Sequence, residues 1–173
     1  MSAWYPMPTE LTTPRLHLGA WRDDDIDDYD TLVHERDPRT AAAPRAGRPT
    51  RDGMRDTIRR QQTSQADTGI GLLVVRIAGR FAGYCGLTVG RASLAEPELA
   101  YELLRGYHGH GYATEAARAV VDAAAGTGRR RLWATVRTWN DASLRVLEKV
   151  GFERTDRVTT DGFGDTVWCT REL

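Results

Sequence analysis

The chain has little of what would indicate a membrane protein, a disulfide framework or a nucleic-acid-binding protein. Its 173 residues include two cysteines and one lysine, Lys149, and 24 acidic residues balance 24 basic ones. Because the net charge is zero, no overall field draws the protein to nucleic acid or to an anionic membrane. No apolar run approaches the ~20 residues that span a bilayer, and the first ten residues lack the basic start and apolar core of a signal peptide. We therefore expect a cytoplasmic protein.

The cysteines and histidines are too few and too scattered to form a site of their own. Cys85 and Cys169 stand in strand-like runs without a Cys-x-x-Cys spacing, so we predict two buried structural thiols. An acyl-cysteine at Cys85 is the alternative, although nothing nearby suggests the electropositive setting that a reactive thiol needs. The four histidines show no metal-ligand spacing, so no metal is expected.

The length suits one domain over residues 1–173 with a core of ordinary size. Periodicity predicts strands over 16–21, 71–77, 80–89, 98–104, 132–137, 155–160 and 165–171. Helices are expected after the caps Asp24, Thr50 and Asn140, and after a glycine-spaced loop near residue 110. This order predicts an α/β (α+β) fold in which a mixed, mostly antiparallel sheet has helices on both faces.

That glycine-spaced loop is the most informative segment. Residues 105–111, here called the glycine loop, read Arg-Gly-Tyr-His-Gly-His-Gly and join a strand-like run to a helix that begins near Ala113. Such a turn leaves backbone N–H groups unpaired at the positive end of the helix dipole, which suits a phosphate or pyrophosphate. Gly109 and Gly111 lack a Cβ, so a ligand can approach their backbone closely. A plain turn without a ligand is, on the loop alone, an equal alternative.

Two other phosphate loops are excluded by the spacing. A P-loop needs Lys and then Ser or Thr after its last glycine, where this chain has Tyr112 and Ala113. The dinucleotide fingerprint is Gly-x-Gly-x-x-Gly early in a βαβ unit, whereas here the order is Gly-x-x-Gly-x-Gly, late in the chain. An unrelated nucleotide-binding domain is therefore the weakest of the possible functions.

Three motifs, taken in order, resemble one known family. They are Tyr101-Glu102-Leu103, then Gly-His-Gly-Tyr-Ala-Thr-Glu-Ala over 109–116, and then Asn140-x-x-Ser143 followed by Lys-Val-Gly-Phe over 149–152. Together they closely resemble the GCN5-related N-acetyltransferases (GNAT), nearest to the ribosomal-protein alanine/serine N-acetyltransferase branch. Residues 13–18 of this chain also resemble the opening of that branch. The resemblance is strong over 96–152 and weak over 34–66. It implies the GNAT acyl-CoA N-acyltransferase fold, and an N-acetyltransferase that uses acetyl-CoA as its cosubstrate.

The resemblance also implies where the cosubstrate lies. The pyrophosphate would contact backbone N–H groups of the glycine loop, and the pantetheine arm would follow the preceding strand, where a backbone N–H could polarise the thioester. The implied contacts are Leu103, Leu104, His108, Gly109, His110, Gly111, Tyr112, Ala113, Thr114, Asn140 and Ser143. Asn140 can also be a plain helix cap, and the two roles are compatible because a cap uses only the side-chain oxygen.

Acetyl transfer to an amine needs a base for the ammonium proton and gains from an acid near the departing thiolate. Glu98 matches the acidic residue of the branch's Glu-x-Gly-Tyr strand motif, with Ala100 in place of Gly, and is the candidate base. An ordinary charged residue at a strand start is the alternative. Many relatives carry a tyrosine acid in the last helix, where this chain has Leu147. Ser143 then remains as candidate acid, the alternatives being water or an exposed serine without a catalytic role.

The acceptor stays open at this stage. The expected reaction is direct attack by a primary amine in a ternary complex, and the amine could be a protein N-terminus or a small molecule. Residues 34–66 should line its pocket. A non-catalytic acyl-CoA-binding or regulatory domain is the alternative function, because Leu147 cannot donate a proton. The sequence does not distinguish a monomer from a homodimer.

Overall fold

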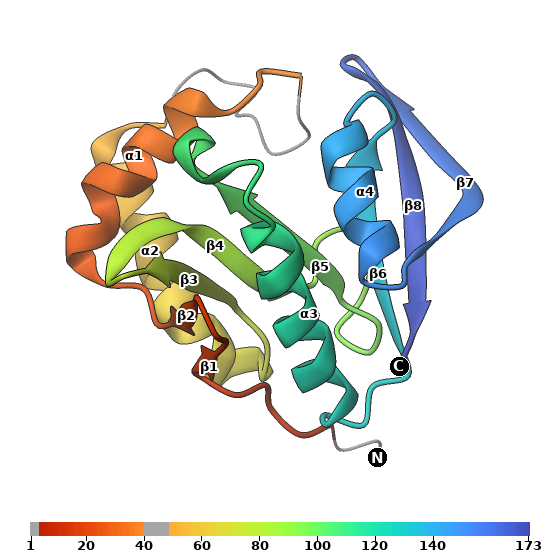
Figure 1. Cartoon of the computed structure of the whole chain (residues 1–173), viewed down its shortest axis with the longest axis horizontal. Helices are drawn as coiled ribbons and strands as arrows, with labels where there is room; N and C mark the ends of the chain where they lie inside the picture. Colours follow the sequence, from red (N-terminus) through yellow and green to blue (C-terminus); the bar gives the residue numbers. More distant parts are fainter. Residues whose placement is uncertain (1–3, 40–48) are drawn as a thin grey trace.

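The computed structural model describes residues 4–39 and 49–173, and Figure 1 traces the chain. Its helices are α1 (Ile26–Glu35), α2 (Arg51–Thr68), α3 (Tyr112–Ala125) and α4 (Asp141–Lys149), with 3-10 turns η1 (Asp23–Asp25) and η2 (Arg105–Tyr107). Its strands are β1 (Leu11–Thr12), β2 (His17–Gly19), β3 (Leu72–Ile77), β4 (Arg80–Thr88), β5 (Glu98–Leu103), β6 (Arg131–Arg137), β7 (Glu153–Asp161) and β8 (Gly164–Glu172).

The described strands form one eight-stranded sheet in the order β1-β2-β3-β4-β5-β6-β8-β7. Every neighbouring pair is antiparallel except β5 and β6, which are parallel and register only at Glu98 opposite Trp133. Beyond that point β6 continues along β8 over its whole length, and β5 continues along β4. The two halves of the sheet therefore separate at the C-terminal end of β5 (Figure 1).

The register of β5 decides which backbone groups face this opening. The N–H of Leu104 donates to the carbonyl of Ala82 (2.9 Å), directly after the pairing of Leu103 with Gly83. In an antiparallel ladder such hydrogen-bonded pairs alternate along the strand, so the even-numbered residues of β5 bond to β4. The backbone groups of Tyr101 and Leu103 consequently point toward β6, where the ladder has ended.

Two hydrophobic clusters cover the two faces of the sheet. On one face α1 and α2 pack Leu32 and Ile58 against Val74 and Phe81. On the other, the apolar stripe of α3 and the inner side of α4 pack against the central strands. The stripe of α3 is built from the small side chains of Ala116, Ala117, Val120, Val121 and Ala124, which allow the helix to lie close to the sheet. The predicted mixed sheet with helices on both faces is confirmed.

Most of the predicted elements are confirmed, with differences near the N-terminus. Thr50 and Asn140 cap α2 and α4 as expected, accepting from Gly53 N–H (3.1 Å) and Ser143 N–H (3.1 Å). Asp24 was the wrong choice for the first helix. The residue before α1 is Asp25, whose side chain makes no capping hydrogen bond to the helix; its carboxylate accepts from the N–H of Arg22 (2.7 Å) and pairs with the buried Arg76 (2.9 Å).

Both cysteines are buried and unpaired, and burial raises the pKa of each thiol. The predicted structural role is thereby favoured over an acyl-cysteine at Cys85. In the part of the chain that the structure describes, no helix is both long and apolar enough to cross a membrane. The same part contains no cluster of His, Cys, Asp and Glu able to hold a metal ion.

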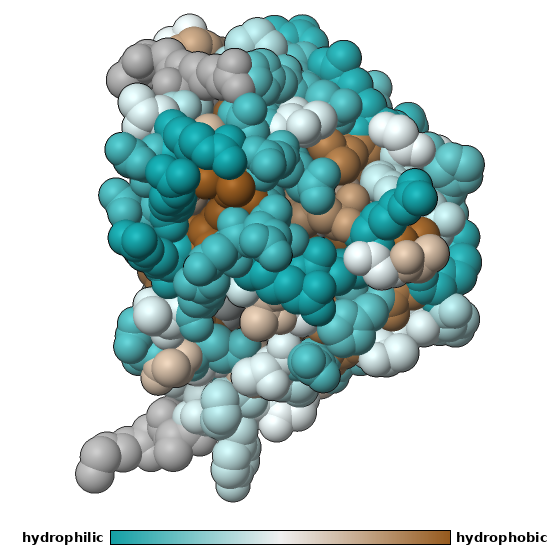
Figure 2. Space-filling model, turned by 90° about the vertical axis from the view of Figure 1, so that its left-hand side faces the viewer, coloured by the Kyte–Doolittle hydropathy of each residue, from teal (hydrophilic) through white to brown (hydrophobic). Residues whose placement is uncertain are grey.

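The surface on the side where α1 lies is mostly hydrophilic, with apolar side chains showing only in small areas between polar ones (Figure 2). The expected acceptor region 34–66 falls partly outside the described residues. Of that region, the structure describes the end of α1, residues 36–39 and residues 49–66, most of which belong to α2.

Candidate active site

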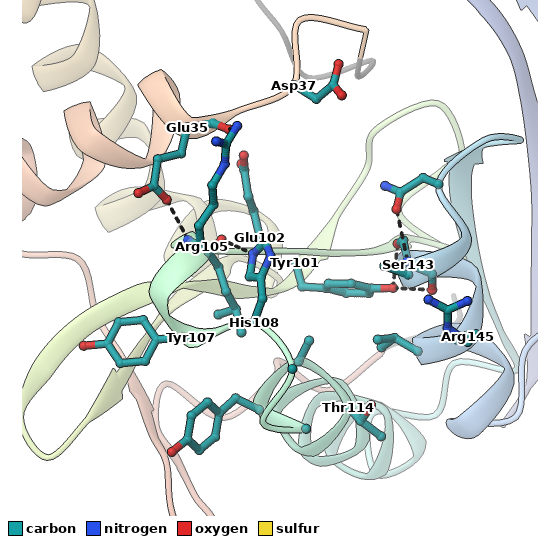
Figure 3. A pocket seen from close by; sticks show the side chains of 18 of the residues that line it. Glu35, Asp37, Tyr101, Glu102, Arg105, Tyr107, His108, Thr114, Ser143 and Arg145 are labelled. Atoms are coloured by element: carbon teal, nitrogen blue, oxygen red, sulfur yellow. Dashed lines mark hydrogen bonds between the residues drawn. The ribbon is translucent and has the colours of Figure 1, made fainter.

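A cavity of about 570 Å³ lies where β5 and β6 separate. Its walls come from the end of α1, from β5, from the glycine loop with the first turn of α3, and from the first turns of α4 (Figure 3). The sequence-predicted residues that line it are Leu103, His108, Gly109, Gly111, Tyr112, Ala113, Thr114, Asn140 and Ser143. Glu98, Leu104 and His110 are not among its lining residues.

The glycine loop presents a row of backbone donors to this cavity. In the described chain the first N–H of α3 to find a helical acceptor is that of Glu115, which donates to the carbonyl of Gly111 (3.0 Å). The N–H groups over 109–114 have no backbone acceptor among the described residues. Gly109 and Gly111 have φ angles of 78° and 79°, in the left-handed region that favours glycine. The loop therefore has the geometry of an anion site at a helix start.

The backbone N–H groups of His108 and Leu104 are bonded within the protein. The N–H of His108 donates to the carbonyl of Arg105 (3.0 Å), and its Nε2 lies 2.8 Å from the carbonyl oxygen of Leu103. The histidine thus ties the loop to β5 instead of offering its own N–H to a ligand. Leu104 has its N–H bonded within the sheet, so Leu103 is the residue whose backbone faces the opening.

A tyrosine hydroxyl reaches α4 from β5. Tyr101 Oη lies 2.8 Å from Ser143 Oγ and donates to the carbonyl of Ser143 (3.0 Å), so the side chain bridges the opening (Figure 3). Burial raises the pKa of Tyr101, although the hydrogen bond with Ser143 lowers it in part. Leu147 is only 1% exposed and belongs to the core. The sequence analysis missed Tyr101 because it shares a strand face with Leu99 and Leu103; a lone hydroxyl among leucines was the available signal.

Glu98 lies away from the cavity. Its side chain is buried, and its carboxylate accepts from Thr135 Oγ1 (2.9 Å) and from the N–H of Arg91. It stands where β5 and β6 still pair, and a rise of four positions along the strand separates it by about 13 Å from Glu102. The structure therefore gives Glu98 the role of a link between strands and does not bring it to the site as a base.

Glu102 is the carboxylate of β5 that does line the cavity. It accepts from Arg36 at both oxygens (2.8 and 2.6 Å) and from the hydroxyl of Tyr84 (2.9 Å). Burial opposes the charge of Arg36, but the hydrogen bonds and charge of Glu102 outweigh it and raise the pKa of the guanidinium. Burial also raises the pKa of Tyr84, with the charge of Glu102 adding to the effect. Sequence analysis had no signal that separated Glu102 from Glu98, since both lie on one face of the strand.

The end of α1 is joined to the start of the glycine loop. Glu35 accepts from the N–H of Arg105 (2.6 Å), and the Arg105 guanidinium donates to the carbonyl of Glu35 (2.8 Å; Figure 3). Glu35, Arg36 and Asp37 line the cavity, whereas no residue of α2 does. Of the expected acceptor region 34–66, the described part that reaches the cavity is therefore its beginning.

These features agree with what the chain is similar to. The family described as "Acetyltransferase (GNAT) domain" matches residues 15–153, so the chain belongs to this family of acetyltransferases. Among curated proteins it is similar to the uncharacterized protein YkkB of Bacillus subtilis (strain 168), with 29% identity over 150 residues, 83% of this chain and 84% of that protein.

Solved structures show the same fold. RimL, a ribosomal L7/L12 alpha-N-protein acetyltransferase in complex with coenzyme A, superposes with a TM-score of 0.78 at 14% identity, covering 96% of this chain and 97% of its own. RimJ of Mycobacterium smegmatis, in complex with CoA-disulfide, gives 0.78 at 21% identity, covering 99% and 89%. The predicted GNAT fold and the resemblance to Rim-type relatives are thus confirmed, and the family identifies an acyl-transfer enzyme.

Proposed function

We propose that the protein is an acetyl-CoA-dependent N-acetyltransferase in which a primary amine attacks the thioester directly within a ternary complex. The observation that carries this proposal is the cavity itself. On one side it has the N–H groups at the start of α3, the open edge of β5 and the hydroxyls of Tyr101 and Ser143. On the other side it has the carboxylates of Glu35, Asp37 and Glu102. The bound coenzyme A in RimL and the CoA-disulfide in RimJ support the cosubstrate.

The cosubstrate takes the side of α3 and α4. Its pyrophosphate accepts from the N–H groups over 109–114, at the positive end of α3. Arg145 and Lys149 of α4 line the same cavity and add positive charge. The pantetheine arm runs along the open edge of β5, as an added strand would. There the N–H of Leu103 polarises the thioester carbonyl as negative charge develops on its oxygen.

The amine takes the side of α1. Glu102 replaces Glu98 as the candidate carboxylate that holds the ammonium and accepts its proton, directly or through water. Both of its oxygens accept from Arg36 (2.8 and 2.6 Å), so the ammonium would share the carboxylate with this guanidinium. The neutral amine nitrogen then attacks the carbonyl carbon, the C–N bond forms, and the C–S bond breaks. The nitrogen of the new amide loses its surplus proton to the Ser143–Tyr101 hydroxyl pair (2.8 Å), and Ser143 Oγ passes a proton to the thiolate, so both hydroxyls end protonated.

The alternative, a non-catalytic acyl-CoA-binding domain, rested on the absence of a tyrosine at Leu147. The Tyr101–Ser143 pair supplies a hydroxyl from another element and weakens that argument. Release of free thiol from acetyl-CoA, measured against a panel of small amines and N-terminal peptides, separates the two functions. Amine-dependent release supports the transferase, and tight binding of CoA without release from any amine supports the binding domain.

A further inference from the structure

The segment before β2 is bound to the first turn of α3. Thr13 Oγ1 donates to Glu115 Oε1 (2.5 Å), and the backbone N–H of Arg15 donates to the same oxygen (3.1 Å). The Arg15 side chain donates from Nε to Glu115 Oε2 (2.7 Å), and its Nη2 lies 2.6 Å from that atom. Both oxygens of this carboxylate are thus engaged by residues one hundred positions away in the chain.

Arg15 also touches the glycine loop. Its Nη1 donates to the carbonyl of His110 (2.9 Å), and its guanidinium lies 4.5 Å from the ring centre of Tyr112. A Cβ placed on Gly111 would come within 3.5 Å of Arg15 Nη2. One side chain therefore contacts the residues on both sides of Gly111, where the donor-rich turn enters α3.

The charge of Glu115 explains why such a contact matters. A carboxylate in the first turn stabilises a helix, because it faces the positive end of the dipole. The same positive end is what attracts an anionic ligand, so an uncompensated carboxylate there would repel a pyrophosphate. Burial opposes its ionisation, but hydrogen bonds from Thr13 and Arg15 outweigh burial and lower the pKa of Glu115. Its charge must therefore be cancelled locally.

We infer that Arg15 is a positioning residue for coenzyme A: it neutralises Glu115 and holds the carbonyl of His110, so that the glycine loop meets the phosphates as a net positive site. The inference rests on the proposed function only in taking coenzyme A as the ligand. It does not depend on which amine is acetylated or on how protons move. Arg15 acts through the loop and through Glu115.

If Arg15 acts by neutralising Glu115, removing either charge should shift the Kd of CoA in opposite directions. If Arg15 only holds the loop in place, no such opposition is expected. Arg15→Gln keeps a hydrogen-bonding side chain and leaves Glu115 uncompensated, so the Kd of CoA by calorimetry should rise about three- to tenfold, the size expected of a partly exposed charge. Glu115→Gln should leave the Kd unchanged or lower it slightly. In Arg15→Gln/Glu115→Gln the Kd should return to within about twofold of the parent, a non-additivity typical of interacting residues.

A ligand without phosphates shows whether Arg15→Gln acts through binding of the pyrophosphate. The KM of S-acetyl-pantetheine should be the same in the parent and in Arg15→Gln, because it has no pyrophosphate for the loop to bind. Arg131→Gln is the matched control. It removes an arginine whose Nη2 lies 2.5 Å from Glu172, at the start of β6 and outside the cavity, and it should not change the Kd of CoA.

If the double variant binds CoA as weakly as Arg15→Gln, or more weakly, Arg15 does not act through the charge of Glu115 and only holds the loop in place. An equal loss for S-acetyl-pantetheine would overturn the placement at the phosphates. Parent protein that does not bind CoA would instead refute the proposed function itself, so the two failures are distinguishable. Thermal melting of each variant shows that the compared proteins are folded.

Discussion

At the scale of residues, two carboxylates on one face of β5 have different surroundings. Glu98 is 6% exposed and accepts from a neighbouring strand and from a turn, so it stabilises the junction of β5 with β6. Glu102 stands beyond that junction, in the cavity, and is bound to a cationic side chain. The difference arises because β6 leaves β5 between the two positions.

Exchanging each carboxylate for its amide separates their roles. Glu102→Gln should lower kcat for amine acetylation by about 10²–10⁴-fold, as expected for loss of a general base. The matched Glu98→Gln should keep kcat near the parent value and lower the melting temperature, since an amide NH2 cannot accept where a carboxylate oxygen did. Rates are measured per folded protein from pH 6 to 9, with CoA affinity as the check on the fold. If Glu98→Gln loses the rate and Glu102→Gln does not, the sequence-based assignment is restored.

The hydroxyl pair makes a second prediction at this scale. Tyr101→Phe keeps the ring and removes the proton source, so kcat should fall by at most about 10²-fold, because an expelled thiolate needs an acid less than an ammonium needs a base. Ser143→Ala should cost a similar factor. The double variant should cost little more than either, because the two hydroxyls act as one relay.

The pH profile provides the control for this relay. Burial raises the pKa of Tyr101 above its ordinary value near 10, so the hydroxyl keeps its proton throughout pH 6–9. The parent should therefore show no fall in kcat toward pH 9 that disappears in Tyr101→Phe. Fully additive losses, or such a fall, would argue against the relay.

At the scale of elements, Gly109 before α3 and Gly128 after it share a left-handed backbone conformation. Gly109 has φ 78° and lines the cavity, and a Cβ there would meet no atom within 4 Å beyond its chain neighbours. Gly128, after α3, has nearly the same geometry, with φ 79° and no neighbour within 4 Å, but does not line the cavity. Comparing substitutions at Gly109 and Gly128 therefore distinguishes a glycine needed only for its backbone conformation from one needed for ligand binding.

Gly109→Ala and Gly128→Ala should each lower stability by about 1–2 kcal/mol, the cost of a left-handed non-glycine residue. Only Gly109→Ala should also weaken CoA binding, by tenfold or more, because its Cβ would occupy the space that the pyrophosphate needs. Urea unfolding gives the first quantity and calorimetry the second. Equal CoA affinity in both variants would mean that Gly109 serves the turn alone.

At the scale of the whole molecule, the cavity is assembled from segments that the sheet brings together. It joins α1, β5, α3 and α4, which lie on different sides of an opening in one sheet. A ligand that fills it connects the two halves, and binding to the folded state alone stabilises by about 2.7 kcal/mol at a hundred times Kd. A protein of this size gains about 2–4 °C in melting temperature for each kcal/mol.

Acetyl-CoA and CoA should therefore raise the melting temperature by about 5–10 °C at saturation. ATP and NAD should raise it much less, since neither carries a pantetheine arm, for which we propose the open edge of β5. Thermal melting with each ligand at equal concentration is the measurement. Comparable stabilisation by ATP or NAD would favour the nucleotide-binding alternative.

The sequence by itself determined the local elements and located the loop that borders the cavity. Periodicity located the central strands, and Thr50 and Asn140 capped helices as their side-chain chemistry requires. The spacing of Gly109 and Gly111 before an apolar helix predicted a donor-rich turn, because glycine spacing and helix starts are local properties. The family motifs lie in the same stretch, 96–152, and the family match over residues 15–153 confirms the family that they indicated.

Tertiary structure alone decided which carboxylate of β5 reaches the cavity. Alternation along β5 put Glu98 and Glu102 on one face, but only the separation of β6 after Trp133 leaves the second one open to a cavity. The contacts Tyr101–Ser143, Arg36–Glu102 and Arg15–Glu115 join residues 42, 66 and 100 positions apart. No periodicity or spacing encodes such pairs, because they depend on which strands pair and where the sheet opens.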